Sequence, residues 1–469
     1  MNSNGRGSNH ASKALCQIGD PKGIRAVIDY IDKNPSNSDH VFTDLIENGN
    51  PAFFDDAVQI FRKINPESKI SNSPAFGRFN DPESIQKLVR IMTVENDEDE
   101  IYYPKAIMAI GKPAAPYLIA ALPNASDRSF RLIVQLLGWI ADPQAVDVII
   151  PLLKHNDPAI QIIAADALGW IGDPRAVPQL IQSLTSSDPK IRAAAAFALG
   201  HTDPKQAIDP LKAALTDADA RVRQWAVYAF LKTESQYSQT ILPLLQDPSV
   251  DVRVVTAMAL GKMKEPLAIE PLIARLSDPE IRVVNQTIIA LSRMPNPRTI
   301  AAIAEKINDA NEYVFKTSIR VLSAIDDPAA LDILITSLSS DRLEIRKTVF
   351  DALLKYKNPR VNDAFVQLLN EKDRQLLEMV IKTLGERRVE SAVIPLCDIL
   401  KRSQDPEVVK ALKNIGDTRA ILPLLERLEK KSQVPMFYVD ALQALSGQTI
   451  GENPVEWRRW YEANIAKPR

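Results

Sequence analysis

The sequence predicts an all-α protein, an α-solenoid of stacked helical hairpins, on three observations: its composition, a short internal repeat and helical spacing of its apolar residues. Glycine makes up 16 of 469 residues and aromatic residues only 6%, although 45% of the chain is hydrophobic. Such a composition favours helices over strands. The 33 prolines are then expected at helix starts, where no backbone hydrogen bond is lost.

The repeat is a step that is usually Asp-Pro or Asn-Pro and that returns along the chain at a nearly constant spacing. Eleven of its fourteen second positions are proline. These positions are Pro21, Pro51, Pro82, Pro113, Pro143, Pro174, Pro204, Ser235, Pro266, Pro297, Pro328, Pro359, Val389 and Thr418. A fixed short period is the signature of a repeat architecture, and it predicts about fourteen hairpins with a period of about 31 residues.

The internal pattern of a unit is clearest between Asp173 and Gly200. Asp173-Pro174 and Asp188-Pro189 each predict an N-cap followed by the first helical residue. Apolar residues follow at helical spacing, at Val177, Leu180, Ile181 and Leu184 in one helix and at Ile191, Ala194, Ala195, Ala198 and Leu199 in the next. Gly200 is predicted to end the second helix in a left-handed conformation. Two helices of about ten to twelve residues fill the unit.

A single hairpin of this size cannot bury both of its faces, so neighbouring hairpins are expected to stack into a continuous core. The chain is expected to divide into a polar tail (1–13), irregular N-terminal repeats (14–112), regular repeats (113–445) and a C-terminal capping helix (446–469). Trp457, Trp460 and Tyr461 are expected to cover the last hairpin.

Two segments carry a resemblance to a known family. Residues 167–177, ALGWIGDPRAV, and residues 222–227, VRQWAV, closely resemble HEAT-like repeats. The short period resembles that of the phycobilisome-lyase-like (PBS lyase HEAT-like) variety. The resemblance extends over essentially the whole chain and is strongest over residues 142–291. It implies the fold and leaves the activity open, because such repeats serve many unrelated roles.

The charge balance and the cysteine content exclude several kinds of function and location. The 57 Lys and Arg residues nearly balance the 59 Asp and Glu residues, so nucleic acid is not an expected partner. Cys16 and Cys397 are too distant in sequence to suggest a disulfide framework or a thiolate metal site. No apolar run approaches the ~18–20 residues of a membrane span, and residues 1–13 lack the apolar segment of a secretory signal. We expect a soluble, cytoplasmic protein.

The sequence shows little catalytic equipment. The four histidines are His10, His40, His155 and His201, and no pair has metal-binding spacing on a helix. Deoxyhypusine hydroxylase, a HEAT-like enzyme, binds its di-iron centre through repeated His-Glu steps, whereas no histidine here precedes a glutamate. Phosphate-loop, dinucleotide and serine-elbow motifs are missing too. No catalytic residue, metal or cofactor is predicted.

Arginines open the second helix of three units, each shortly after an aspartate. The residues are Arg192, Arg223 and Arg253, with Asp188, Asp217 and Asp247. The resemblance to HEAT-like repeats implies that they form a structural ladder between adjacent units, with a binding surface as the alternative. Arg282 and Arg346 depart from this register, so the ladder is expected to break there.

A second column follows the predicted helix-ending glycine and returns once in every repeat. Its members are Trp139, Trp170, His201, Lys232, Lys262 and Arg293. Stacking would place them along one edge, where they could hold an acidic or aromatic partner through ring stacking, cation–π contacts and charge. In the alternative, the tryptophans cover loops and the cations cap helix C-termini.

Two functions of different classes remain open. One is a non-catalytic scaffold that binds a protein partner along its solenoid surface. The other is implied by the resemblance: a bilin lyase, or a lyase-like chaperone, acting on phycobiliproteins. In such a reaction the accepting cysteine belongs to the substrate, so missing catalytic groups do not exclude it. A phycobiliprotein would then be the partner.

Overall fold

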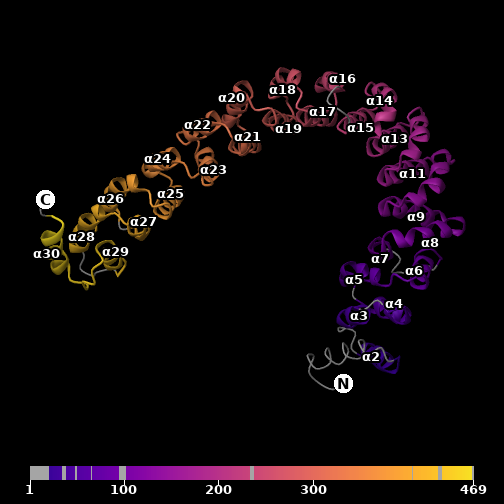
Figure 1. The fold of residues 1–469 in the computed structure, drawn as a ribbon, viewed down its shortest axis with the longest axis horizontal. Helices are drawn as coiled ribbons and strands as arrows, with labels where there is room; N and C mark the ends of the chain where they lie inside the picture. The colour runs from indigo at the N-terminus through magenta and orange to yellow at the C-terminus, as the bar shows by residue number, and fades with distance from the viewer. Residues whose placement is uncertain are drawn as a thin grey trace. The chain divides into compact units, whose positions relative to one another are not determined.

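A computed structural model describes residues 21–33, 38–47, 50–64, 66–94, 102–232, 237–403, 405–430 and 436–466. The predicted polar tail, residues 1–13, lies outside these ranges. Throughout them, α-helices and short 3₁₀ turns are the only regular elements (Figure 1). The chain divides into two compact units, Met1–Glu265 and Pro266–Arg469. Each unit is built from stacked helical hairpins, so the predicted α-solenoid is confirmed.

In the first unit, the helices alternate between the first and second positions of successive hairpins. The first helices are α2 (Pro21–Lys33), α4 (Phe54–Lys63), α6 (Pro82–Val94), α8 (Ala115–Ala121), α10 (Val146–Ile149), α12 (Val177–Ser183), α14 (Ile208–Ala214) and α16 (Ser238–Ile241). The second helices are α3 (Ser38–Ile46), α5 (Pro66–Asn72), α7 (Tyr103–Ile110), α9 (Asp127–Ile140), α11 (Pro158–Ile171), α13 (Pro189–His201), α15 (Ala220–Phe230) and α17 (Val250–Met263).

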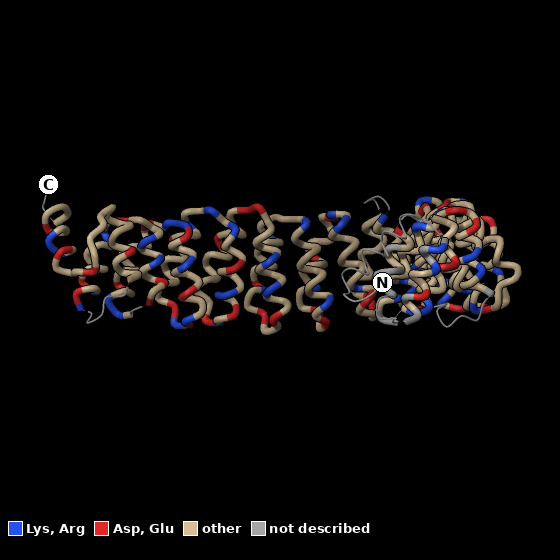
Figure 2. Tube along the Cα trace, turned by 90° about the horizontal axis from the view of Figure 1, so that it is seen from below, with Lys and Arg blue, Asp and Glu red and all other residues tan. Residues whose placement is uncertain are grey.

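The second unit continues the same alternation within itself. Its first helices are α18 (Ile269–Arg275), α20 (Pro297–Glu305), α22 (Pro328–Ser337), α24 (Pro359–Gln367), α26 (Val393–Arg402), α28 (Ile421–Glu429) and α30 (Pro454–Asn464). Its second helices are α19 (Ile281–Ser292), α21 (Glu312–Ala324), α23 (Leu343–Leu353), α25 (Arg374–Glu386), α27 (Pro406–Ile415) and α29 (Met436–Ser446). Figure 2 shows these helices side by side, with residues of both charges interspersed along them.

The predicted Asp-Pro caps are present at the start of both helices of the repeat. The Asp173 carboxylate accepts a hydrogen bond of 2.9 Å from the backbone N–H of Arg175, and Asp188 accepts one of 2.8 Å from Lys190. After Asp173 the chain forms a 3₁₀ turn, and α12 has only seven residues. The α-helical part of the first helix is thus shorter than predicted, because the first turn after the cap is 3₁₀.

The glycines of the second helices allow each of these helices to pack closely against the next one. Gly200 lies inside α13 and does not take a left-handed conformation, so its predicted role as a helix end is wrong. A Cβ atom built on Gly200 would lie 3.0 Å from the Cα of Ala229, and one on Gly138 only 2.6 Å from the Cα of Ala167. These positions let neighbouring second helices approach each other backbone to backbone.

The last helix, α30, packs on α28. Trp457 is fully buried and donates its indole N–H to the carbonyl of Gly451 at 2.8 Å. The Trp460 ring meets it edge-on at 6.1 Å. The boundaries predicted at residues 112/113 and 445/446 stay predictions.

The Gly138 seam gives a direct test of this packing. Alanine normally stabilises a helix relative to glycine by about 1 kcal/mol, but at Gly138 its methyl group would overlap the backbone of Ala167. We expect Gly138→Ala to lower the free energy of unfolding by about 1–3 kcal/mol, measured by urea denaturation. Gly451→Ala is the control, because no atom lies within 4 Å of its Cβ position; equal losses in both variants would contradict the close-packing role.

Candidate functional site

The candidate site is a set of aromatic side chains on four consecutive second helices of the first unit, α9, α11, α13 and α15. We call this set the aromatic stripe; its members are Trp139, Trp170, Phe197, His201, Trp225 and Tyr228. The helices that carry them pack against one another in chain order. The aromatic stripe therefore crosses four layers of the repeat.

Ring contacts join most of the aromatic stripe into one cluster. The Phe197 ring lies 5.4 Å from Trp170, 4.3 Å from His201 and 4.9 Å from Trp225, centroid to centroid. The His201 ring stacks on Tyr228 at 5.6 Å with an interplanar angle of 18°. Trp139 and Trp170 each leave 51% of their surface exposed. Large aromatic faces are thus held in fixed positions at the surface.

His201 is held in the cluster as a largely neutral imidazole. Its Nδ1 lies 2.9 Å from the carbonyl oxygen of Phe197, one helical turn earlier. Burial lowers the pKa of His201, and the nearby ammonium of Lys232 lowers it further, against the opposing effect of that hydrogen bond. At neutral pH the ring acts chiefly as an aromatic surface.

Two lysines lie beyond the aromatic stripe at the next two positions of the column. Burial lowers the pKa of Lys232, and the positive charge of Lys262 lowers it further. No carboxylate of the described residues opposes these two effects. Both lysines are exposed, so this end of the surface presents two neighbouring cations.

The predicted column is thus brought together over five of its six positions, from Trp139 to Lys262. Its sixth member, Arg293, occupies the C-cap position of α19 in the second unit. In the second unit the next two positions of the column are Ala324 and Lys355. The ammonium of Lys355 donates a hydrogen bond to the carbonyl of Ser323. In the following hairpin, the Arg387 guanidinium donates to the carbonyl of Tyr356 at 3.1 Å. In the second unit, cations in this region hold helix ends, as the structural alternative supposes. Binding by the column stays a proposal.

A small slot lies between Trp139 and Trp170. It has a volume of about 120 Å³ and is lined by Gln135, Trp139, Ile163, Asp166, Ala167 and Trp170. Burial raises the pKa of Asp166 to about 6. The slot is too small for a drug-sized ligand, which needs roughly 300 Å³ or more, but it can admit one side chain.

Sequence reasoning missed Asp166 and the stripe members Phe197, Trp225 and Tyr228. Asp166, Phe197 and Tyr228 each precede a column residue by four positions, which places them one turn earlier on the same helix face. That spacing was readable in the sequence. The burial of the Asp166 carboxylate between two layers was not.

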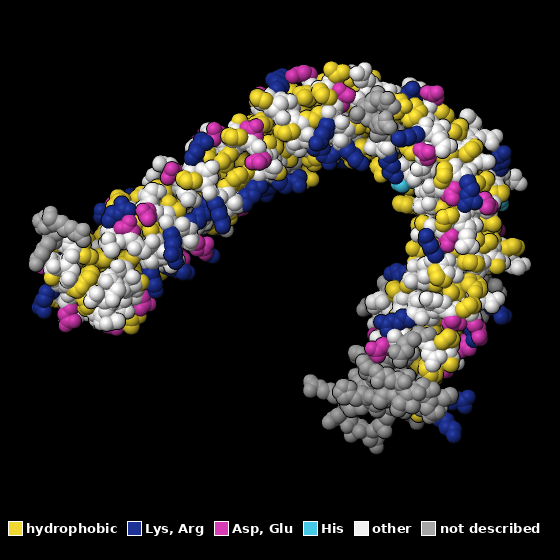
Figure 3. All heavy atoms as spheres, in the orientation of Figure 1, with side chains coloured by type: hydrophobic (Ala, Val, Ile, Leu, Met, Phe, Trp, Pro, Cys, Tyr) yellow, Lys and Arg dark blue, Asp and Glu magenta, His cyan; other side chains and the backbone are white. Residues whose placement is uncertain are grey.

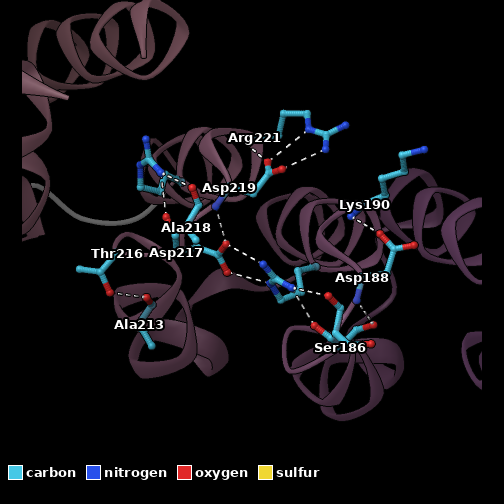
Figure 4. A network of polar contacts seen from close by, with 12 residues as sticks. Ser186, Asp188, Lys190, Ala213, Thr216, Asp217, Ala218, Asp219 and Arg221 are labelled. Atoms are coloured by element: carbon cyan, nitrogen blue, oxygen red, sulfur yellow. Dashed lines mark hydrogen bonds and ion pairs between the residues drawn. The ribbon is translucent and has the colours of Figure 1, made fainter. Parts of the chain in front are cut away.

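The ladder residues form a second, separate system at the turns between first and second helices. The guanidinium of Arg192 makes two hydrogen bonds of 2.8 Å to the Asp217 carboxylate of the next hairpin. It also donates to the carbonyl of Ser186 in its own turn at 2.9 Å. Figure 4 shows Asp217 in this network, beside the cap formed by Asp219 and Arg221. One side chain thus ties two adjacent turns together.

The same arrangement recurs in both units. Arg223 bonds Asp247 at 2.7 and 2.8 Å, and in the second unit Arg346 bonds Glu371 at 2.6 and 3.0 Å. The expected break at Arg346 is therefore wrong, because a glutamate supplies the carboxylate there. Arg253 donates to the carbonyl of Asp247 at 2.9 Å.

Two parts of the predicted ladder stand apart from this arrangement. The Asp188 carboxylate serves as the cap of α13. The expected break at Arg282 stays a prediction.

These ion pairs set the pKa of their carboxylates. The hydrogen bonds from Arg192 hold the pKa of Asp217 below its usual value. For Asp247, burial pushes the pKa upward, but Arg223 and the N–H of Ser249 together outweigh it and the pKa is lowered. The ladder carboxylates are therefore ionised at neutral pH.

The described residues offer no group of three or more metal-ligating side chains. Cys397 is buried, and burial raises the pKa of its thiol to about 11, so it is a poor nucleophile. Among the described helices, none is by itself long and apolar enough to cross a membrane, although the bent pair Tyr103–Ile110 and Lys112–Asn124 meets that test jointly.

The repeated hairpins, the close-packed second helices and the ladder of turns define an α-solenoid repeat protein. The family model of HEAT repeats matches residues 115–187, 177–238, 238–314, 270–353, 300–379 and 338–412. The model of the PBS lyase HEAT-like repeat matches residues 407–430. The chain belongs to the HEAT-repeat family.

Solved structures with similar folds come from several kinds of protein. Kap121p is 13% identical with a TM-score of 0.50, over 82% of this chain and 51% of its own. A chain from the structure of Kap95p binding to RanGDP is 13% identical with a TM-score of 0.45, over 97% of this chain and 74% of its own.

The complex of CpcE and CpcF of phycocyanin lyase from Nostoc provides a third similar chain. It is 22% identical with a TM-score of 0.31, over 48% of this chain and 92% of its own. A search of curated proteins finds no significant match. At these identities the likenesses show the fold alone.

The ladder predicts a pH-dependent loss of stability. Arg223→Met leaves the Asp247 carboxylate buried without its partner, which we expect to cost about 3–5 kcal/mol of unfolding free energy at neutral pH. Because the pKa of Asp247 is lowered in the folded state, its contribution is present above its unfolded pKa and is lost as the pH falls through its folded pKa. The cost should therefore shrink on acidification.

Urea denaturation at neutral pH and at about pH 3 measures the loss of unfolding free energy caused by Arg223→Met at each pH. Arg175→Met is the matched control, since its ion pair with Asp147 is exposed and should be worth less than about 1 kcal/mol. Equal effects at the two sites, or a cost that grows on acidification, would contradict the assignment.

Proposed function

We propose that this HEAT-repeat protein is a non-catalytic scaffold that binds a protein partner along the aromatic stripe. The observation that carries the proposal is the exposure of Trp139 and Trp170, each 51% exposed, beside a continuous cluster of aromatic rings. Exposed apolar patches of this kind mark interaction sites. Tryptophan and tyrosine are also the residues that most often dominate binding energy in interfaces.

The layout of the aromatic stripe favours an extended protein segment as the ligand. Packed helices lie about 8–10 Å apart, so four layers span roughly 24–30 Å, the length of about eight residues of extended chain. Lys232 and Lys262 continue the surface with positive charge. The partner segment is expected to carry apolar or aromatic side chains and, at one end, acidic groups. We place this interaction in the cytoplasm.

A bilin-handling role is the second candidate, and one observation favours it. Aromatic faces beside two exposed lysines would suit the rings and propionates of an open-chain tetrapyrrole. In that case the protein would act as a lyase or chaperone toward a phycobiliprotein. The same surface serves both candidates, so the ligand distinguishes them.

The scaffold proposal predicts a loss of affinity on truncating the exposed tryptophans. Partners captured from an extract of the source cells by the immobilised protein are identified and purified, and their affinity is then measured by calorimetry. We expect Trp170→Ala or Trp139→Ala to weaken binding at least tenfold, as for a typical interface hot spot. Tyr313→Ala, at an aromatic residue 65% exposed in the second unit, is the control. Unchanged affinity in both tryptophan variants would refute the proposed surface.

The bilin candidate predicts a spectral change on titration with phycocyanobilin. A saturable red shift near one equivalent, weakened by Trp170→Ala and by Lys262→Ala, would assign the bilin function. An unchanged spectrum would exclude bilin binding and leave the scaffold proposal in place.

A further inference from the structure

We propose that the slot between Trp139 and Trp170 receives an arginine side chain of the partner, stacked between the two indoles and bound by the carboxylate of Asp166. This inference rests on the proposed function and adds to it the chemistry of one contact. It assigns a cation-binding position to one end of the aromatic stripe, whereas Lys232 and Lys262 make the other end basic.

The geometry of the slot provides the first argument. Trp139 on α9 and Trp170 on α11 occupy equivalent positions of adjacent hairpins, and both line the slot together with Gln135 and Asp166, which lie one turn earlier on the same two helices. Both indoles are half exposed. A cation over the face of a tryptophan ring gains about 0.5–2 kcal/mol, and two tryptophan rings line this slot.

The isolation of Asp166 provides the second argument. Burial is the only influence on the pKa of this carboxyl, so no hydrogen-bond donor or cation of the described residues offsets its desolvation. A half-buried carboxylate without a partner is unfavourable for folding. Within the first unit, the equivalent positions on α9, α13, α15 and α17 hold the uncharged residues Gln135, Phe197, Tyr228 and Met258.

Charged groups on the neighbouring helices do not supply the missing partner. The titratable and charged side chains of the three helices around the slot are Asp127, Arg128 and Arg131 on α9, Asp166 on α11, and Lys190, Arg192 and His201 on α13. Arg131 pairs with Asp157 at 2.9 Å and Arg192 with Asp217 at 2.8 Å. None of these groups affects the pKa of Asp166.

Arginine fits this environment better than lysine. Its guanidinium is planar, stacks on aromatic faces and is more weakly hydrated than an ammonium, so it enters a narrow slot at lower cost. It can also donate two parallel hydrogen bonds to one carboxylate. The slot, at about 120 Å³, admits one side chain, so the contact would fix a single residue of the bound segment.

The test uses the full chain with its tryptophans isotopically labelled. The protein contains five tryptophans, so a ¹⁵N spectrum shows five indole signals, each assignable through a Trp→Phe variant. The probe is N-acetylarginine methylamide. We expect a saturable shift of the Trp139 and Trp170 signals, while the buried Trp457 and its neighbour Trp460 stay unchanged.

Three matched comparisons decide the outcome. The citrulline analogue has nearly the same shape without charge and should give no saturable shift. The lysine analogue should bind more weakly. Asp166→Asn should weaken arginine binding about tenfold or more, the scale of a charge-assisted hydrogen bond. Equal shifts with citrulline, equal binding of lysine, or unchanged binding by Asp166→Asn would each overturn the proposal.

The pH dependence provides a readout that a purely structural role of Asp166 would not give. Because the carboxyl titrates near pH 6 in the empty slot, arginine binding should strengthen as the pH rises from about 5 to about 7. In the Asp166→Asn protein this rise should be lost, apart from any effect of His201, whose ring lies 5.6 Å from that of Trp170. A wild-type profile no steeper than that of Asp166→Asn would overturn the proposal. Circular dichroism of each variant verifies that the helices are retained.

Failure here is distinguishable from failure of the proposed function. If arginine does not bind but Trp139→Ala still weakens partner binding, the slot proposal is wrong and the scaffold proposal stands. If the tryptophan variants keep full partner affinity while arginine binds in the slot, the scaffold surface is misplaced and the cation site stands on its own.

Discussion

The first unit depends on the close approach of consecutive second helices at their glycine and alanine positions. Gly138 lies against Ala167, Gly169 against Ala198 and Gly200 against Ala229, each too near to admit a methyl group without movement. Since these glycines follow one another at one repeat period, each seam fixes the rotation of one helix relative to the next. The aromatic stripe follows from this register: the residue after each glycine emerges at the same edge in every layer.

The ladder of turns and the seam of small residues join adjacent hairpins at opposite ends of the second helices. Arg192 and Arg223 tie adjacent turns at the N-terminal ends of the second helices, whereas the glycines act near the C-terminal ends. Buried ion pairs fix the register of the elements that they join more readily than they add net stability. Small residues bury little apolar area, but they let neighbouring helices come close together. With both ends fixed, the side chains of the exposed edge are free to serve binding.

Features that recur in the repeats could be predicted from the sequence, whereas contacts made by single residues with the next hairpin could not. The period and the Asp-Pro or Asn-Pro caps were readable because most units carry them. Gly200 was assigned to a helix end because a glycine before a polar residue also marks a C-cap; the alanine that it faces, Ala229, belongs to the next hairpin. The ladder was expected to break at Arg346 on grounds of register, but the carboxylate of Glu371 on the next hairpin completes it there. Asp166 escaped notice because a single carboxylate on a helix is ordinary until its burial is known.

The contrast between the two units bears on which surface is functional. At this edge of the second unit, Lys355 and Arg387 are engaged with the carbonyl groups of a preceding helix end. Figure 3 shows further Lys and Arg side chains over the helices of that unit, mixed with apolar and acidic ones. In the first unit the equivalent edge instead holds half-exposed tryptophans and two lysines that repel each other. None of these groups is satisfied by the fold, and each would be stabilised by a ligand of complementary chemistry. Their concentration on successive layers of one unit is the reason to locate binding there.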